Sequence, residues 1–341
     1  MKISAALPSG VSASFFSAAK QRRRLEQRLV GSLEGRDFSE VILPILDYLD
    51  PYLPMLSVGG RSELYRFIDR DGEQLALRAD FTPMLARLIA PRLASLELPL
   101  RLFYRGDVVR YREFRPGRAR ESHQMGAELL GVGGEAGERE ILRVFLELLR
   151  ATGLQDLRVV LGFAGVLEAA AEECAASREE AAELLAQVQR RERGAFRRSQ
   201  GSAQEALMQV VENGVPEHFD ALGETAGEGC LQLQRLLQEM TQDFPEIQLT
   251  LDLAEFAQVS RRLPDSEATA GRSYYDGLLF RAFAAGEASP LGGGGRYDQL
   301  FEAVGAHVPA VGFSLALEQV LAANPEEASN SEETARNEVT R

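Results

Sequence analysis

Hydrophobic and polar positions repeat with two different periods along the chain, which predicts both helices and strands. Apolar side chains recur at helical spacing over residues 11–34 and 138–151. Residues 122–130 alternate strictly instead, as expected of a strand with two different faces. Short apolar runs predict further strands at 38–43, 64–68, 74–78, 158–163, 248–256 and 274–283.

The order of these elements predicts an α+β fold with a mainly antiparallel sheet flanked by helices. Residues 167–245 have a helical pattern rich in Ala, Glu and Gln, so we expect a helical insertion within one domain that spans residues 1–322. Residues 323–341 are charged and contain few apolar side chains, so we expect an acidic, disordered tail there.

The stretch 104–131 is the part of the chain around which the other elements are expected to be arranged. It predicts a short strand, a turn at Gly106 and Asp107, a loop near residues 116–117, and a return strand at 122–130.

One face of the return strand carries polar groups at both ends. Gln124 and Glu128 lie ~13 Å apart, at about 3.3 Å per residue, and Gly126 leaves the floor between them bare. This pattern suits a small zwitterionic ligand with a second polar end. An ordinary exposed strand face has the same pattern, so the alternation alone does not separate the two interpretations.

Asp80 and Thr82 precede a predicted helix. Thr82 is placed to cap a helix that begins at Pro83, a favoured first position. Asp80 comes before this cap, has no such local role, and is expected to face a cleft. Further along, the glycine run at 292–295 predicts either a turn close to a sheet or a cradle for phosphate.

Arginine supplies nearly all of the positive charge. Lys2 and Lys20 are the two lysines among 38 basic residues, which excludes a Walker-type loop with its lysine. Seven arginines fall within twenty residues, which predicts either a solvated loop or a site for an anion. They are Arg101, Arg105, Arg110, Arg112, Arg115, Arg118 and Arg120.

Composition removes several classes of function. A net charge of −13 disfavours a general nucleic-acid binder. No run of eighteen apolar residues predicts a membrane span, and the first thirty residues lack a secretory signal, so we expect a cytoplasmic protein. Two cysteines and three histidines predict neither a disulfide framework nor a metal site. We expect no cofactor.

Taken together, these segments resemble the catalytic domain of class II histidyl-tRNA synthetases over most of residues 5–322. The resemblance lies in an ordered set of motifs, which is more specific than any one of them. The matching segments are 35–44 (first motif), 77–82 (LRADFT), 106–128 (second motif), 294–298 (GGRYD) and 311–313 (start of the third motif).

This resemblance implies a pocket for the amino acid histidine. Its ammonium group would lie near Asp80, Thr82 and Gln124. Its imidazole would meet Glu128 and a tyrosine. The tyrosine matched to that role is Tyr275, with Tyr274 beside it, and the arginine of the second motif corresponds to Arg110. Asp80 stands where the family has glutamate, which keeps the charge and shortens the reach.

Two departures from the synthetase pattern affect the chemistry of ATP. Ala270 and Gln319 stand where the family has arginines. Adenylate formation needs cations around the phosphates, and loss of one such group typically costs about 10²–10³ in rate. The chain also ends after the third motif, where synthetases continue into an anticodon-binding domain.

A histidine pocket without ATP chemistry resembles the regulatory subunits of ATP phosphoribosyltransferase. That resemblance implies a non-catalytic protein that dimerises and forms a hetero-octamer with a short catalytic subunit. It also implies feedback inhibition of the first step of histidine biosynthesis by L-histidine. Two alternatives remain at this point. One is a truncated or divergent synthetase-like enzyme that activates a carboxylate with ATP, and the other is a tRNA-binding regulator that uses the basic segment 190–198.

Overall fold

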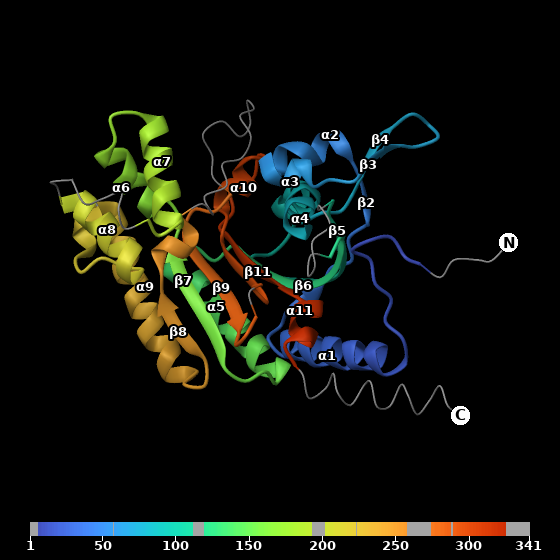
Figure 1. The fold of residues 1–341 in the computed structure, drawn as a ribbon. Helices are drawn as coiled ribbons and strands as arrows, with labels where there is room; N and C mark the ends of the chain where they lie inside the picture. Colours follow the sequence, from blue (N-terminus) through green and yellow to red (C-terminus); the bar gives the residue numbers. More distant parts are fainter. Residues whose placement is uncertain are drawn as a thin grey trace.

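The computed structural model describes residues 6–56, 58–111, 119–192, 202–222, 224–257, 274–287 and 289–324. Within these parts of the chain, eight strands form one sheet (Figure 1). In spatial order they are β1 (Ser39–Glu40), β5 (Leu100–Val109), β6 (Glu121–Leu130), β11 (Ala310–Ala316), β10 (Gly292–Arg296), β9 (Leu278–Ala284), β7 (Leu157–Phe163) and β8 (Gln248–Leu251).

Most neighbouring strands in this sheet pair antiparallel. The two exceptions among the described strands are the outermost pairs, β1 with β5 and β7 with β8, which are parallel. This arrangement confirms the predicted α+β fold with a mainly antiparallel sheet.

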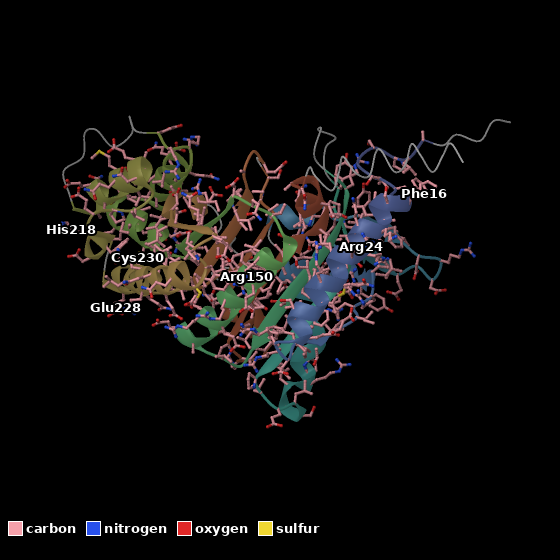
Figure 2. All side chains as sticks on the ribbon, turned by 90° about the horizontal axis from the view of Figure 1, so that it is seen from below. Phe16, Arg24, Arg150, His218, Glu228 and Cys230 are labelled. Atoms are coloured by element: carbon pink, nitrogen blue, oxygen red, sulfur yellow. The ribbon has the colours of Figure 1, made fainter. Side chains whose placement is uncertain are left out.

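One face of the sheet carries the main hydrophobic core. Helices α1 (Phe16–Glu34), α5 (Gly134–Thr152), α9 (Glu224–Asp243) and α11 (Leu317–Ala322) cover this face. Figure 2, seen from below, shows α1 and α5 side by side in front of the strands. The helices lie there because each has an apolar stripe at helical spacing. In α5 this stripe includes Ile141, Phe145 and Leu148, all fully buried.

The opposite face of the sheet carries smaller elements near β5 and β6. A second sheet consists of β2 (Leu46–Tyr48), β4 (Gln74–Leu77) and β3 (Arg66–Ile68), with β4 in the middle. The helices around it are α2 (Leu49–Tyr52), η1 (Leu53–Met55), α3 (Val58–Ser62), α4 (Phe81–Ile89), η2 (Ala90–Ser95) and α10 (Asp298–Glu302).

In its described residues, the segment between β7 and β8, where the sequence predicts a helical insertion, contains four α-helices. Besides α9 they are α6 (Val166–Cys174), α7 (Arg178–Gln189) and α8 (Ser202–Asn213), with the short turns η3 (Phe219–Leu222) and η4 (Leu253–Phe256) nearby. These helices form a second hydrophobic cluster with its own buried side chains. Helix α9 belongs to both clusters, because Leu236 and Met240 pack on the sheet while Cys230 packs on the other helices. The tail predicted at 323–341 lies outside the described residues from 325 onward.

The predicted turn at Gly106 and Asp107 is wrong. Strand β5 continues through both residues, which pair with Gln124 and His123 of β6. Glycine is needed at 106 for a close approach, because a Cβ there would meet the Arg78 side chain at 2.9 Å. The chain therefore forms one long β5–β6 hairpin.

The glycine run at 292–295 was also misread, as it forms neither a turn nor an open loop. It is the inner strand β10, paired with β9 on one side and β11 on the other. The predicted strand at 38–43 is shorter than expected, since its described pairing is limited to β1. The predicted strand at 274–283 begins only at Leu278, so the tyrosines at 274 and 275 precede it and do not occupy opposite faces of a strand.

Candidate functional site

Strand β6 presents Gln124, Gly126 and Glu128 on the face that carries the smaller elements, as its alternation predicts. The floor at Gly126 is not bare, which corrects the sequence interpretation. Tyr104 of β5 lies directly opposite Gly126, and a Cβ at Gly126 would collide with the Tyr104 hydroxyl. Tyr104 is held in place by Phe81, whose ring stacks on it at 4.2 Å between centroids. A glycine at 126 thus makes room for the tyrosine.

Glu128 is a buried carboxylate, with only 1% of its surface exposed. Thr82 Oγ1 donates a hydrogen bond to its Oε1 at 2.7 Å, and the Tyr297 hydroxyl donates one to its Oε2. Across the sheet, Glu128 faces Gly312 of β11, where a Cβ would overlap Oε2. The carboxylate occupies the volume that this glycine leaves open.

Burial raises the pKa of Glu128 to about 8. The hydrogen bonds from Tyr297 and Thr82 act in the opposite direction, and the nearby negative charge of Asp80 adds to the increase. The same site raises the pKa of Tyr104 well above its ordinary value, through burial first and the charge of Glu128 second. The site can therefore hold a proton on Glu128 near neutral pH.

Asp80 occupies the N-cap of α4, so the predicted capping role of Thr82 is wrong. The Asp80 carboxylate accepts a hydrogen bond from the Thr82 backbone N at 3.2 Å. Aspartate has the short side chain that N-caps require. Thr82 lies in the first turn, which frees its hydroxyl for Glu128. The Tyr52 hydroxyl fixes the cap from behind, accepting from the Asp80 backbone N at 2.8 Å.

Arg110 connects this buried cluster to a cleft. Its Nε donates to the Ala79 carbonyl at 2.7 Å, and its guanidinium lies 3.8 Å from the Asp80 carboxylate. The cleft has a volume of about 430 Å³. Gln124, Arg120 and Gln319 also line it. Gln319 is one of the two positions where the synthetase pattern has an arginine, and helix α11 places it in this cleft.

The described arginines of the cluster at 101–120 lie in two different surroundings, and the first two belong to strand β5, not to a solvated loop. Arg101 pairs with Glu140 at 2.6 Å, and Arg105 pairs with Glu40 at 2.8 Å, as ordinary surface ion pairs. Arg110 and Arg120 line the cleft instead. Arg112, Arg115, Arg118 and the second altered position, Ala270, lie outside the described residues.

Tyr274 and Tyr275 lie in the loop before β9, with their rings 4.7 Å apart at an angle of 66°. Tyr274 is directed toward the buried cluster, 6.3 Å from the Tyr297 ring. Burial, followed by the charge of Asp80, raises the pKa of Tyr274 well above its ordinary value. Tyr275 packs near Leu279 and lies over Gly295. Tyr274 is thus the tyrosine of this pair that belongs with Asp80 and Glu128.

The seven predicted site residues form two adjoining groups. Asp80, Thr82, Glu128 and Tyr274 form the buried group, in which Thr82 and Glu128 are buried and the other two are partly buried. Arg110 and Gln124 line the cleft, and Tyr275 lies beside Tyr274.

Sequence reasoning missed two tyrosines of the buried group, Tyr104 and Tyr297. Tyr104 could have been predicted from the sequence only with knowledge of the register of β5 on β6, which places it opposite Gly126. Tyr297 lies within the GGRYD segment, which signalled the resemblance but not this contact with Glu128.

Neither a metal site nor a membrane-spanning helix is found in the described parts of the chain. No three His, Cys, Asp or Glu side chains there are grouped to hold a metal ion. No helix there is both long and apolar enough to cross a membrane.

The sheet, the β5–β6 hairpin and the residues on its face define a class II synthetase-like catalytic domain. The family model described as histidyl-tRNA synthetase matches residues 14–320. A solved structure described as an ATP phosphoribosyltransferase regulatory subunit/histidyl-tRNA synthetase from Bacillus halodurans superposes with a TM-score of 0.80. At 21% identity it covers 100% of this chain and 91% of that chain, and it supports the fold.

Sequence relatives narrow the family further. The ATP phosphoribosyltransferase regulatory subunit of Moorella thermoacetica is 34% identical over 337 residues, covering 95% of this chain and 83% of that protein. The regulatory subunit of Symbiobacterium thermophilum is 32% identical over 333 residues, covering 94% and 80%. The chain belongs to the family of ATP phosphoribosyltransferase regulatory subunits, which share the histidyl-tRNA synthetase-like domain.

Proposed function

We propose that this chain is a non-catalytic subunit that binds L-histidine and joins a short ATP phosphoribosyltransferase catalytic subunit in the cytoplasm. In this role it would be required for the first step of histidine biosynthesis and would transmit feedback inhibition. The observation that carries the proposal is the cluster of Asp80, Thr82 and Glu128, in which Thr82 contacts both carboxylates.

The two carboxylates suit the two ends of a histidine molecule. Asp80 is partly exposed and lies beside the cleft, where it can accept from the ligand's ammonium group. Glu128 is buried between Tyr297 and Thr82 and can accept from an imidazole N–H. Hydrogen bonds to charged groups contribute about 1.5–3 kcal/mol each. Gln124 would join Asp80 at the ammonium group, and Arg110 would hold the ligand's carboxylate end from the cleft, with Tyr274 and Tyr275 closing the side.

The residues that line the cleft support the proposal that this protein does not activate histidine with ATP. Gln319 places a neutral amide in the cleft where the synthetase pattern has a cation. One observation favours the alternative, a carboxylate-activating enzyme that uses ATP. Arg110 and Arg120 still line the cleft and can approach phosphate oxygens.

Feedback requires that histidine bind the inactive assembly more tightly than the active one. The coupling free energy in such systems is typically about 1–3 kcal/mol. We propose that the assembly is a hetero-octamer in which this chain first forms a dimer.

The small sheet supports self-association. Leu46, Tyr48 and Phe67 share one of its faces and are 43%, 56% and 41% exposed. The preceding loop adds Ile42, which is 89% exposed. Clustered exposed apolar side chains mark interaction surfaces, and a second copy of this chain is the occupant we propose.

The proposal is tested by mixing the chain with the short catalytic subunit from the same organism. Phosphoribosyl transfer should rise when this chain is added and should fall again with L-histidine. The Glu128→Gln variant replaces the buried carboxyl group by an amide at nearly constant volume and so removes one acceptor oxygen from the pocket. It should still activate but should respond to histidine at least about tenfold more weakly. Isothermal calorimetry of the isolated variant should show the same loss of affinity. A catalytic rate that is indifferent to this chain would contradict the proposal.

A further inference from the structure

The outer edge of the main sheet at β8 is unpaired in the described parts of the chain. Strand β8 pairs with β7 on its inner side and is the last strand in the sheet order. Leu249, Thr250 and Leu251 are only partly buried. An unpaired edge presents backbone N–H and C=O groups, which makes it a template for a strand from another chain.

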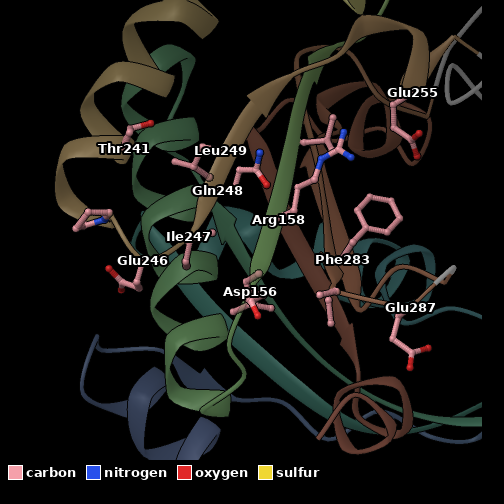
Figure 3. A pocket seen from close by; sticks show the side chains of 15 residues that line it. Asp156, Arg158, Thr241, Glu246, Ile247, Gln248, Leu249, Glu255, Phe283 and Glu287 are labelled. Carbon is pink, nitrogen blue, oxygen red and sulfur yellow. The ribbon is translucent and has the colours of Figure 1, made fainter.

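A large cleft lies beside this edge, and Figure 3 shows that its lining includes Thr241 and Leu249 on the α9 side as well as Arg158 and Phe283 on the other. Its volume is about 860 Å³. Arg158 of β7 is paired with Gln248 of β8 and with Phe283 of β9, so these three side chains share the face that forms its floor. The floor is thus an uncovered part of the same sheet face that carries Glu128 farther along.

A second groove lies on the other side of β8, against helix α9. Its volume is about 680 Å³, and Leu251, Leu231 and Leu237 line it. Leu231 is 49% exposed. Successive side chains of a strand point to opposite faces, so a strand added to β8 would place alternate side chains in the two grooves. Backbone pairing and two grooves together form a complete site for strand addition.

The charges at the first cleft indicate which kind of segment can bind there. Asp156, Glu246 and Glu287 lie around it, with Arg158 as the cation on its floor. A second copy of this chain docked through the same edge would bring the same acidic rim against it. Like charges oppose such pairing, whereas a basic segment is attracted.

We propose that the outer edge of β8 is the docking site for an extended, positively charged segment of the catalytic subunit. This inference rests on the proposed function. The segment forms a ninth strand of the sheet and places its apolar side chains in the groove lined by Leu251. Its basic side chains lie against Asp156 and Glu287.

The test measures binding of the short catalytic subunit from the same organism by sedimentation velocity, for the full chain and three variants. Leu251→Lys puts a charge into the apolar groove beside the edge and should weaken binding at least about tenfold. The double variant Asp156→Lys, Glu287→Lys alters only the rim, and it should weaken binding and reduce its dependence on salt. Leu96→Lys makes the same change at an exposed leucine after η2, away from β8, and this variant should bind as the unaltered chain does.

Circular dichroism and histidine calorimetry on each variant check that the fold is kept. The rim variant keeps the test decisive even if Leu251→Lys fails to fold. If the unaltered chain does not bind the catalytic subunit at all, the proposed function fails, and the docking site fails with it. If the unaltered chain binds and the folded edge and rim variants bind equally well, the β8 edge is overturned while the proposed function stands.

Discussion

The buried carboxylate of Glu128 makes the stability of this protein depend on pH in a defined way. Its pKa is about 8 in the folded chain, against an ordinary value of 4.5. The folded state therefore holds the proton through a pH range in which the unfolded state has already lost it. The free energy of unfolding must fall as pH rises through this range, because the unfolded state binds fewer protons.

The gap between the two pKa values corresponds to about 5 kcal/mol in total, at about 1.4 kcal/mol per unit. The stabilising contribution of the protonated group is full below the ordinary pKa and is lost by the time pH exceeds the folded pKa. Between about pH 5.5 and about pH 8.5, ionisation of Glu128 alone should lower the free energy of unfolding by about 3–4 kcal/mol. This is a large part of the stability of a typical domain, about 5–15 kcal/mol.

Glu128→Gln isolates this contribution because glutamine cannot ionise and has nearly the same shape. Urea unfolding should be followed by circular dichroism at fixed protein and salt concentrations, since the chain contains no tryptophan. The difference in unfolding free energy between the two proteins should change by about 3–4 kcal/mol across the range, in favour of the variant at high pH. Tyr297→Phe removes a hydrogen bond that favours the carboxylate, so the fall should move to higher pH. Parallel pH profiles for the original chain and Glu128→Gln would refute the reasoning.

Three further predictions concern the charge of Asp80, the packing at Gly312 and the absence of ATP chemistry. Asp80→Asn keeps a good N-cap but removes the charge. The temperature of the unfolding midpoint should therefore stay the same, while calorimetry should show at least about tenfold weaker histidine binding. A variant that loses both stability and affinity, or that loses neither, would contradict this division of roles. Gly312→Ala places a methyl group on the Glu128 carboxylate and should lower the free energy of unfolding in urea by about 1–3 kcal/mol. Gly31→Ala in α1 is the control, because a Cβ there meets nothing, and it should be neutral or stabilising. Equal effects at both positions would argue against the packing around Glu128. Pyrophosphate exchange with ATP and histidine should stay at background, and clear exchange would favour the enzyme alternative.

The class of the fold and the strand at the centre of the site were predictable because burial of one face forces a strict pattern. In β6, Gln124 and Glu128 share a face whatever lies around them, since side chains alternate along any strand. The predicted return strand at 122–130 differs from β6 by one residue at its start. Helix α1 begins five residues later than its pattern suggested, because apolar residues before Phe16 extend the periodicity without extending the helix.

Glycines were harder to interpret because glycine has two different structural roles. A glycine allows a turn, and it also allows two pieces of backbone or a side chain to come close. At Gly312 and across β10 the second use applies, and the partner that comes close belongs to another strand. The identity of that partner depends on the order of strands in the sheet, which a local pattern does not contain.

The missed Tyr104 shows how one local error conceals part of the candidate site. A turn at Gly106 would have ended the ladder before Tyr104 reached Gly126, so the strand floor was expected to be empty. In the continuous β5–β6 hairpin the two residues lie directly opposite, and the tyrosine fills that floor. Tyr104 and Tyr297 both lie beside Glu128, so the proposed ligand would bind above a layer of tyrosines. Under the proposed function, a carboxyl group enclosed in this way would select ligands by hydrogen bonding, because an incoming group that makes no hydrogen bond to Glu128 would leave a buried polar group without that partner.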